Sequence, residues 1–380
     1  MTDTLHIVSF DIPHPPVYGG VIDVMYKIRA LADQGARIHL HCFHDQREAA
    51  PALEEYCEKV DYYPRLTRHR EHLSRSPYIV NSRRAEGLKQ RILKEPGPIL
   101  FEGLHTCHLL SDPELQELPK WVRTHNIEHE YYRGLMASER SPLKRRYYQI
   151  EAAKLERFEK ILRYADLILA INPREKEHFQ RYSTSIHLPP FHPYKKVGPE
   201  RTDRGFALYH GKLSVSENEK AALYLLEEVL PNLEIPFIIA GEGASERLLE
   251  KVGECPNASY EACNSPERID ELIQEARVNV LPTFQATGIK LKLLAALFKG
   301  RHCVVNPPMV QGTGLEGLCR IGQDAEGLRS ELEQCMQEPF EKEQIRERNG
   351  ILLTDLNNQR NGDLLLKRQE LTRSPSNLHT

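Results

Sequence analysis

The sequence predicts an α/β protein of two domains, each a mainly parallel sheet with helices between its strands. The chain has 380 residues, which is too many for one ordinary hydrophobic core. Short apolar runs alternate with amphipathic runs, and this alternation stops over residues 188–205, where four prolines and scattered charges occur, before it resumes. We therefore expect a first domain at 1–187, a linker at 188–205, a second domain at 206–335, and C-terminal helices with a frayed tail at 336–380.

The first domain opens with a predicted β-α-β unit. Residues 5–10 read as a buried strand, and after a proline-rich loop Gly19 and Gly20 open a helix from about 21 to 34. The next strand is expected at 37–43. A glycine turn between strand and helix is where doubly wound folds bind ligands, although the two glycines can equally serve only a tight turn. The dinucleotide fingerprint G-x-G-x-x-G is absent, which disfavours an oxidoreductase.

Polar residues follow two further strands of this domain. Glu102 and His105 come after a strand at 99–101, and His125 and Asn126 after a strand at 121–124. Parallel strands end at one edge of a sheet, so His125 should point into a cleft between the two domains and not into the core. Glu102 and His105 are candidates to orient a substrate or to act as acid or base. A helix at 140–164 and a strand at 167–171 continue the alternation.

The second domain repeats the same alternation. We expect its strands and helices, in chain order, at 206–210, 218–229, 237–240, 269–276, 278–281, 290–299 and 303–305, with further helical material at 341–368. Glycine turns follow several of these strands. Gly211 and Lys212 come after the first, Gly241 after the second, Gly288 precedes the helix at 290–299, and Gly312 and Gly314 lie beyond the last.

The stretch 281–314 is a candidate anion site. Two glycine turns flank a helix whose first turn carries Lys290 and Lys292. Free N–H groups and the helix dipole at such an end attract a diphosphate, although the dipole alone contributes only about 0.3–1 kcal/mol. Lys212 could neutralise charge on a leaving phosphate. The alternative is an ordinary strand–turn–helix–strand unit whose lysines face water.

Composition excludes several classes of protein. Hydrophobic residues make up 40% and charged residues 28%, which is typical of a soluble globular chain. No apolar run approaches the roughly 18 residues of a membrane span, and the N-terminus lacks a signal-peptide pattern, so we expect a cytoplasmic protein. The eight scattered cysteines favour buried thiols over disulfides or a zinc site. A net charge of −3 argues against nucleic acid as a partner.

The charge is nevertheless uneven. Residues 65–94 hold nine lysines and arginines against only Glu71 and Glu86. One interpretation is a solvated helical face. The other is a patch that contacts an anionic membrane surface, at the inner face of the cytoplasmic membrane, or an acidic substrate.

Several motifs, taken in chain order, resemble those of a known family. These are P-x-x-G-G at the first glycine turn, the strand that ends in His125-Asn126, the segment G-K-L-S-x-x-x-N from Gly211, and GIKLKLLAAL followed by GTGL. Together they are similar to retaining GT-B glycosyltransferases of the bacterial mannosyl- and glucosyltransferase-like superfamily. The resemblance covers nearly the whole chain and implies two Rossmann-like domains with a cleft between them, a nucleotide-sugar donor, and a glycan or lipid-linked acceptor.

The resemblance also implies roles for particular residues. His125 would bind the donor sugar or stabilise its transition state, with Asn126 beside it, and Lys212 and Lys292 would contact the diphosphate. Gly19 and Gly20 would form the loop that approaches the diphosphate and the acceptor. The loop beneath the donor would be the segment Gly312, Thr313, Gly314 and Leu315. Enzymes of this class need no metal or other cofactor, because basic side chains and a helix N-terminus neutralise the diphosphate.

One departure from the family pattern affects the expected activity. The family places a glutamate one turn beyond the lysine of this helix, where it binds the ribose hydroxyls, and here that residue is Ala295. The earlier acid of the pattern is also missing, with Gln285 near its place. Loss of such an acceptor typically costs about 1.5–3 kcal/mol, or roughly ten- to hundred-fold in affinity. The alternative function is therefore a catalytically impaired relative that acts as a scaffold or sugar-binding partner.

Overall fold

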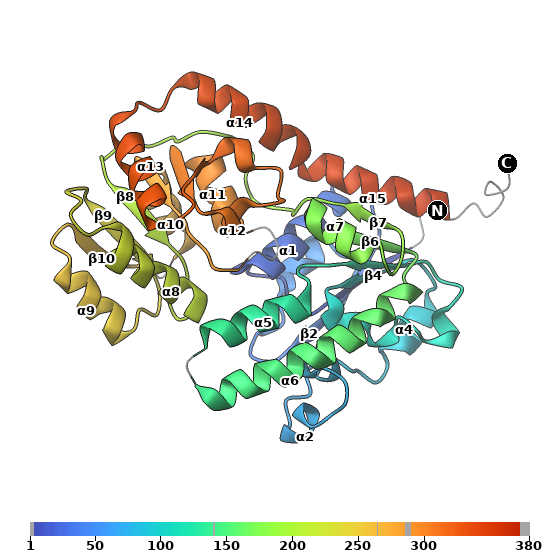
Figure 1. The fold of residues 1–380 in the computed structure, drawn as a ribbon. Coiled ribbons are helices and arrows are strands. Elements are labelled where there is room, and N and C mark those ends of the chain that lie inside the picture. The colour runs from blue at the N-terminus through green and yellow to red at the C-terminus, as the bar shows by residue number, and fades with distance from the viewer. Residues whose placement is uncertain (1–3, 140, 264, 286–289, 373–380) are drawn as a thin grey trace. The chain divides into compact units, whose positions relative to one another are not determined.

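The computed structural model describes residues 4–139, 141–263, 265–285 and 290–372 and shows two compact units (Figure 1). The first unit holds the chain up to Tyr132, the segment Tyr147–Pro193 and the chain from Leu356 onward. The second holds Arg133–Arg146 and Tyr194–Asp355. Each unit is a parallel sheet with helices between its strands, as the sequence predicted.

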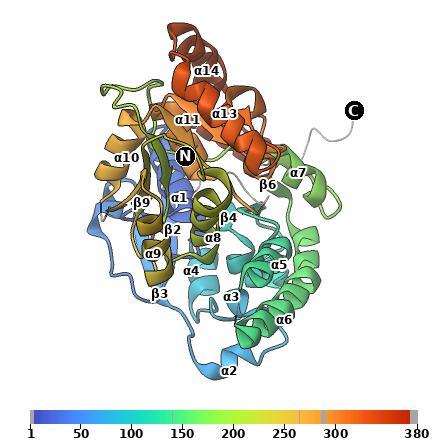
Figure 2. The same cartoon turned by 60° about the vertical axis from the view of Figure 1, so that its left-hand side comes forward.

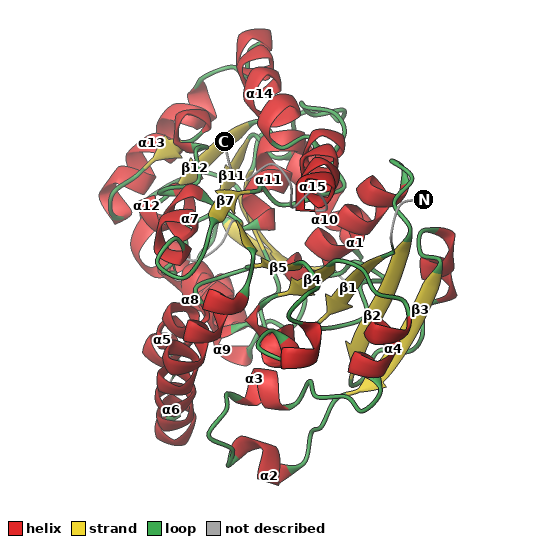
Figure 3. Cartoon of the chain, turned by 90° about the vertical axis from the view of Figure 1, so that its right-hand side faces the viewer, coloured by secondary structure: helices red, strands yellow, loops and turns green. Residues whose placement is uncertain are grey.

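The first unit is organised around a parallel sheet whose described strands follow the order β3-β2-β1-β4-β5-β6-β7 (Figure 3). In chain order these strands are Leu5–Ser9, Ile38–His44, Lys59–Pro64, Ile99–Glu102, Lys120–Arg123, Leu167–Ala170 and Ser185–His187. The central strands are buried along their whole length because helices cover both faces, which explains their nearly continuous apolar sequences. One apolar core lies on each face.

The helices of this unit include α1 (Gly19–Ala32), which follows β1. A Cβ at Gly20 would approach Cζ of Phe10 to 2.6 Å, so a larger residue at the start of the helix would displace the Phe10 ring. The remaining helices wholly within the unit are α2 (His69–His72), α3 (Tyr78–Asn81), α4 (Leu88–Lys94), α7 (Pro173–Phe179) and α15 (Asn358–Thr372). Helices α5 (Glu128–Ser138) and α6 (Pro142–Phe158) are each divided between the two units.

The C-terminal segment 336–380, predicted as one appended piece, is divided between the units. Helix α14 (Lys342–Asp355) belongs to the second unit, where buried Arg348 donates to the carbonyl of Gly300 at 2.9 Å. Helix α15, red in Figure 1, returns to the first unit and packs against α1, and Leu365 joins its core. The predicted linker is divided in the same way, because Leu188 and Phe191 are buried in the first unit and the boundary falls after Pro193.

The second unit has a parallel sheet whose described strands follow the order β10-β9-β8-β11-β12-β13, of which Figure 2 labels β9. In chain order, with β8 first, they are Ala207–His210, Phe237–Gly241, Ala258–Ala262, Val278–Val280, His302–Val305 and Arg320–Ile321. Helices α8 (Ser216–Tyr224), α9 (Glu246–Glu254), α10 (Pro266–Glu275), α11 (Leu291–Lys299), α12 (Pro307–Val310) and α13 (Ala325–Gln337) connect or follow them. The predicted helix at 218–229 ends in a π-helical turn, Leu225–Val229.

The charged stretch, the cysteines and the hydrophobic segments each have a definite place in the structure. The basic stretch 65–94 does not form one helical face, because it is divided among the short helices α2, α3 and α4. All eight cysteines lie in the described residues and are free thiols, and six of them are buried as predicted. Within the described residues, no helix combines the length and the apolar character that crossing a membrane requires.

Candidate functional site

Both sheets reverse their strand order at one point, and the predicted site residues lie around these two points. In the first unit the order changes between β1 and β4, and in the second between β8 and β11. Open parallel sheets bind ligands beyond the carboxyl ends of their strands at such a switch point. Each unit carries a cluster of polar side chains there.

The cluster of the first unit joins α1 to β4 and β5 through buried charges. Lys27 donates to Oδ2 of Asp23 at 3.0 Å and to Oε1 of Glu102 at 2.6 Å. Arg123 binds Asp23 through two hydrogen bonds, from Nε at 3.0 Å and from Nη2 at 2.9 Å. The backbone N–H of Phe191 adds a third donor to Asp23 at 2.8 Å. Two buried cations therefore balance two buried carboxylates.

The ionisation of these carboxylates follows from the same contacts. Burial by itself would raise the pKa of Asp23, but the nearby Arg123 and Lys27 outweigh burial and hold this pKa well below its usual range. Burial likewise opposes ionisation of Glu102, and Lys27 and the hydrogen bond from His125 bring its pKa below the ordinary value. Both carboxylates are therefore ionised at neutral pH.

His125 lies at the edge of this cluster, as predicted for a residue at the end of β5. Its Nε2 is 3.1 Å from Oε2 of Glu102, its Nδ1 is 4.0 Å from Oδ2 of Asp23, and the edge of Phe10 packs against the ring. The side chain is 9% exposed. Carboxylates face both ring nitrogens, so the orientation of the imidazole is fixed before any ligand arrives.

The other predicted residues of the first unit lie close by. His105 packs its ring against Phe10, and burial together with Arg83 holds its pKa well below the ordinary value, so it is neutral. Asn126 hydrogen-bonds the buried Glu128. Gly19 and Gly20 open α1, the helix that carries Asp23 and Lys27.

The sequence reasoning missed Asp23, Lys27 and Arg123. Two signals pointed to them. Arg123 stands inside the apolar strand KWVR, and Asp23 and Lys27 stand four residues apart on a helix whose neighbouring positions are apolar. A buried charge needs a partner of opposite sign, so charged residues in apolar runs indicate an internal ion pair.

The second unit brings two glycine loops together beyond β8 and β9. A Cβ at Gly241, which has φ of 150°, would collide with the carbonyl oxygen of Gly211, and a Cβ at Gly243 would come within 2.8 Å of the Ser214 side chain. The two loops are also joined by the N–H of Leu213, which donates to the carbonyl of Glu242 at 2.8 Å. Backbone N–H groups without bulky side chains are what a phosphate site requires.

Lys292, on the first turn of α11, lies beside these loops. Its Nζ donates to Oδ1 of Asn218 at 2.7 Å, lies 4.9 Å from the centre of the Tyr209 ring, and would be 3.0 Å from a Cβ at Gly211. Burial lowers the pKa of Lys292 to about 8. Asn218 in turn donates to the carbonyl of Lys212 at 2.9 Å, so it links the loop to the lysine.

The other two predicted lysines differ in their surroundings. Nζ of Lys290 is 3.9 Å from Glu217, which also accepts a hydrogen bond from Thr283, so Lys290 shares a polar cluster with the N-terminus of α8. Lys212 is 61% exposed and pairs with Glu242 at 2.8 Å. The structure thus places Lys292 and Lys290 at the switch point and Lys212 on the surface beside it.

The predicted loop Gly312–Leu315 follows β12 and α12. Gly312 and Gly314 have φ of 74° and 81°, which favours glycine, and the N–H of Gly312 donates to Glu316 at 2.6 Å. Thr313 is buried and its hydroxyl donates to the carbonyl of Val310 at 2.6 Å, while Leu315 is buried. Gly288 lies outside the described residues.

Ala295, the position of the expected glutamate, faces the apolar core of the second unit. It is 5% exposed and packs in a cluster with Leu208, Ala240 and Leu272. Gln285 is buried, and neither atom of its amide has a hydrogen-bond partner among the described residues.

Neither cluster offers vacant carboxylates for a metal ion. Asp23, Glu102 and His125 bring ligand atoms within 4.8 Å of one another, but Lys27 and Arg123 already neutralise both carboxylates. In the second unit the carboxylates of Glu242 and Glu217 face Lys212 and Lys290, at 2.8 and 3.9 Å, and Lys292 is a further cation beside the glycine loops. These donors suit an anion better than a cation.

Comparison with known proteins gives relatives in sequence and in structure. No family model matches the chain. An uncharacterized 44.6 kDa protein in the cps region of Klebsiella pneumoniae is 27% identical over 331 residues, which cover 81% of this chain and 84% of that protein.

Solved structures match over nearly the full length. Anabaena HepE in complex with UDP and glucose has a TM-score of 0.62 at 11% identity, covering 97% of this chain and 99% of that one. The lipopolysaccharide outer core galactosyltransferase WaaB has a TM-score of 0.63 at 14% identity, covering 98% of this chain and 100% of that one. An α,α-trehalose-phosphate synthase (UDP-forming) from Burkholderia vietnamiensis has a TM-score of 0.62 at 12% identity, covering 97% of this chain and 100% of that one. The chain therefore has the GT-B fold, in which two Rossmann-like domains follow one another along the chain.

Proposed function

We propose that this protein is a glycosyltransferase that moves a hexose from a nucleotide-sugar donor to a glycan acceptor with retention of the anomeric configuration. The observation that carries the proposal is the position of Lys292, a partly buried cation beside Gly211 at the switch point of the second sheet. The GT-B fold supports it, and so does the UDP in the HepE structure that this chain resembles.

In this proposal the second unit binds the donor. Lys292 and Lys290 neutralise the diphosphate without a metal ion, and the glycine loops at Gly211 and Gly241 let its oxygens approach backbone N–H groups. The loop Gly312–Leu315 lies beneath the donor. Lys212 is a further cation for the phosphates, and it would have to exchange its ion pair with Glu242 for one with the ligand.

The first unit supplies His125 to the sugar in this proposal. Its imidazole is fixed by Glu102 and by the edge of Phe10, so the ring orders little further when a sugar binds. Asp23, Lys27 and Arg123 act through their neighbours and position this residue. Glu102, His105 and Asn126 are assigned to the acceptor side in this proposal.

The acceptor is proposed to be a polysaccharide or a lipid-linked glycan in the cytoplasm. Support comes from the cps region in which the Klebsiella relative is encoded, and from WaaB, which is a lipopolysaccharide enzyme. The exposed arginines of the segment 65–94 would hold the protein at an anionic membrane surface.

The experiment is a thermal-shift titration of the purified protein with UDP-glucose, UDP-galactose and GDP-mannose. A ligand that binds only the folded state raises its stability in proportion to the logarithm of ligand concentration over Kd. We expect one of these donors to raise the melting temperature, and Lys292→Ala to weaken that donor about ten- to hundred-fold, since a hydrogen bond to a charged group contributes about 1.5–3 kcal/mol.

Two variants separate this expectation from a general charge effect. Lys251→Ala removes an exposed lysine of the same unit that pairs with Glu254, and should leave donor affinity unchanged. Lys212→Ala tests the predicted second cation. If no donor raises the melting temperature and the His125→Ala variant retains every property of the parent, the proposal fails.

The second candidate function is a catalytically impaired relative that binds sugars or partners. The observation that favours it is Ala295, which packs in the apolar core where the family resemblance implies a ribose-binding glutamate. The matched pair Ala295→Glu and Ala295→Gln distinguishes the two functions, because both side chains have similar volume and only one is charged. A higher donor affinity in the glutamate variant than in the glutamine variant would indicate a decayed ribose site.

A further inference from the structure

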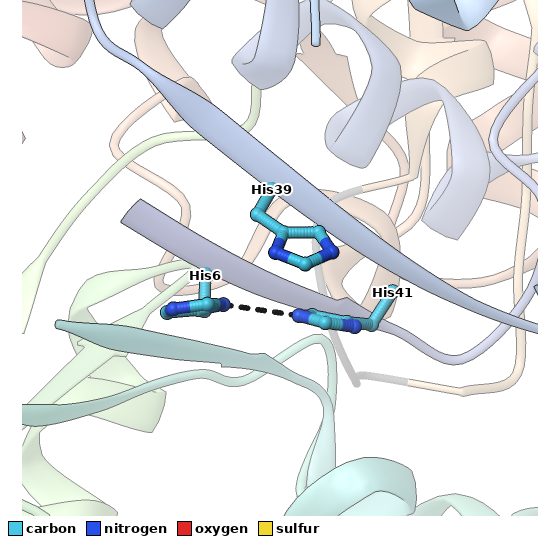
Figure 4. Close-up of side chains that lie close together, drawn as sticks. All are labelled: His6, His39 and His41. Carbon is cyan, nitrogen blue, oxygen red and sulfur yellow. Dashed lines mark hydrogen bonds between the residues drawn. The ribbon is translucent and has the colours of Figure 1, made fainter. Parts of the chain in front are cut away.

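Three histidines gather on one face of the first sheet, away from the switch point. His6 on β1 and His39 on β2 are register partners, and His41 follows two residues later on the same strand. Alternate residues of a strand share a face, so all three rings lie together. Figure 4 shows His6 and His41 end to end with the ring of His39 over the contact between them. All three side chains are buried.

The outer nitrogen of each ring has a partner of its own. Nε2 of His6 lies 2.7 Å from the carbonyl of Glu95, and Nε2 of His39 lies 2.8 Å from Oδ2 of Asp61. Nδ1 of His41 lies 3.0 Å from the hydroxyl of Tyr63. A carbonyl and a carboxylate only accept hydrogen bonds, so His6 and His39 each carry their proton on Nε2.

The inner nitrogens of His6 and His39 therefore carry lone pairs, and Nε2 of His41 donates a hydrogen bond to Nδ1 of His6. With Nε2 protonated, the neutral rings of His6 and His39 keep lone pairs on Nδ1, and Nδ1 of His39 is buried without a hydrogen-bond partner in the described part of the chain. Nδ1 of His6 and Nε2 of His41 are 3.0 Å apart. One ligand nitrogen from each ring lies within 4.8 Å of the other two. A buried polar atom without a partner is costly, and a metal ion bound between the three rings would give Nδ1 of His39 one.

We propose that His6, His39 and His41 bind a zinc ion or a similar divalent transition metal. Zinc binds imidazole nitrogen at about 2.0–2.1 Å, which at tetrahedral angles separates two ligand nitrogens by about 3.3–3.4 Å. The pair His6–His41 is already near this separation. A water molecule would occupy the fourth coordination position, and the metal would link β1 to β2 inside the first unit.

The outer partners match what metal-bound histidines require. A ligating imidazole usually donates its other N–H to a carboxylate, a carbonyl or a hydroxyl, which fixes the ring and raises its basicity. Asp61 and Glu95 supply two of these. Tyr63 is a hydroxyl, which can donate to His41 before metal binding and accept from it afterwards. His41 can therefore move its proton from Nε2 to Nδ1 and free Nε2 for the ion.

Two other clusters of possible ligands in the described residues lack this arrangement. In Asp23, Glu102 and His125 the carboxylates are neutralised by lysine and arginine. In His129, Glu159 and His178 the carboxylate of Glu159 accepts from His178 at 2.7 Å and from Tyr182 at 2.9 Å, and its other oxygen is 3.1 Å from His129. The second cluster provides a matched control, because it contains two histidines in a similar setting without inward lone pairs.

The test is zinc binding by the full chain without a histidine tag. The protein is loaded with ZnSO₄ in the presence of a weak chelator, dialysed, and its zinc measured by mass spectrometry. We expect one equivalent in the parent, about the same in His178→Gln, and at least a hundredfold weaker binding in His39→Gln. Asp61→Asn should weaken binding about ten- to hundred-fold, the usual effect of removing an outer partner.

Other results would overturn the proposal. They are no retained zinc in the parent, or retention by His39→Gln equal to that of the parent. If His39→Gln fails to fold, X-ray absorption of the zinc-loaded parent decides the question. A first shell with scattering from about three imidazole rings supports the site, and a shell with one ring or none refutes it.

Discussion

Lys27 donates a 2.6 Å hydrogen bond to Oε1 of Glu102, and both side chains are fully buried. This contact joins α1, the helix after β1, to the end of β4. Strands β1 and β4 flank the switch point of the first sheet. Because Glu102 also holds His125, the lysine fixes the position of a candidate site residue that it does not touch. The stability of the unit and the geometry of its site therefore depend on the same ion pair.

Replacing Lys27 by methionine should destabilise the protein strongly. The variant keeps the volume of the side chain but leaves Glu102 buried beside only His125, and breaking a buried pair in this way typically costs about 3–5 kcal/mol. Urea unfolding measures the difference. Lys196→Met is the control, because its ion pair with Glu200 is 82% and 68% exposed, and it should have no measurable effect. Similar unfolding curves for both variants would contradict a structural role for Lys27.

Glu128→Gln should stabilise the protein, and more at pH 8 than at pH 5. Burial, and then the neighbouring Glu175, raise the pKa of Glu128 to about 8, and its Oε1 lacks a partner in the described residues. In the unfolded chain the pKa of a glutamate is near 4.3, so the folded protein holds this proton more tightly than the unfolded chain does. The resulting stability is fully present below pH 4.3 and is lost as the pH rises toward 8. Glutamine stays neutral throughout. We expect a gain of roughly 1–3 kcal/mol at pH 8 by urea unfolding.

The control for this prediction is Glu117→Gln, since Glu117 is an exposed residue of the same unit. Its stability difference from the parent should not change between pH 5 and pH 8. A Glu128→Gln variant whose stability parallels the parent across this range would show that the buried carboxyl ionises freely.

The sequence predicted the central strands of both sheets and missed their edges. Strands β3, β7, β10 and β13, none of which was predicted, are the outermost strands of the two sheets. An edge strand is paired on one side only and is more exposed, so its sequence need not be apolar. β10, ASYEA, is partly exposed along its length, and β13 has only two residues. A hydrophobic pattern in the sequence detects strands that are buried. These edge strands can be recognised only by their hydrogen bonds to a neighbouring strand in the folded protein.

The candidate site could also be predicted from the sequence only in part. The positions of His125, Gly211 and Gly241 could be predicted because each stands at the end of an apolar strand, and that of Lys292 because helical periodicity marks the start of α11. The surroundings of Lys212 could not, since its ion pair with Glu242 joins two loops that are distant in sequence and meet only where Gly211 and Gly241 pack together. Asp23 and Arg123, a hundred residues apart, also pair only in the folded chain.

The membrane contact proposed for the segment 65–94 can be tested with vesicles. Arg68 and Arg75 are exposed, and between them Leu73 is 87% exposed. Each arginine near an anionic surface contributes about 1 kcal/mol, so Arg68→Ser with Arg75→Ser should weaken binding to phosphatidylserine vesicles roughly thirtyfold at low salt. Co-sedimentation measures this. The pair Arg163→Ser with Arg181→Ser removes the same charge from another exposed part of the chain and should bind as the parent does. Equal losses in both pairs would refute a specific contact.

The ionisation of Lys292 gives the proposed donor site a characteristic pH dependence. Burial lowers the pKa of this lysine to about 8, so it is a cation below pH 8 and becomes neutral above it. The phosphates of UDP lose their last proton near pH 6 and keep a constant charge above pH 7. We therefore expect UDP affinity by calorimetry to fall as pH rises from 8 to 9.5, by at most about tenfold per pH unit. Lys292→Arg retains its charge throughout this range, so its affinity, whatever its absolute value, should stay constant. If the parent also shows constant affinity, Lys292 is not the cation that binds the diphosphate.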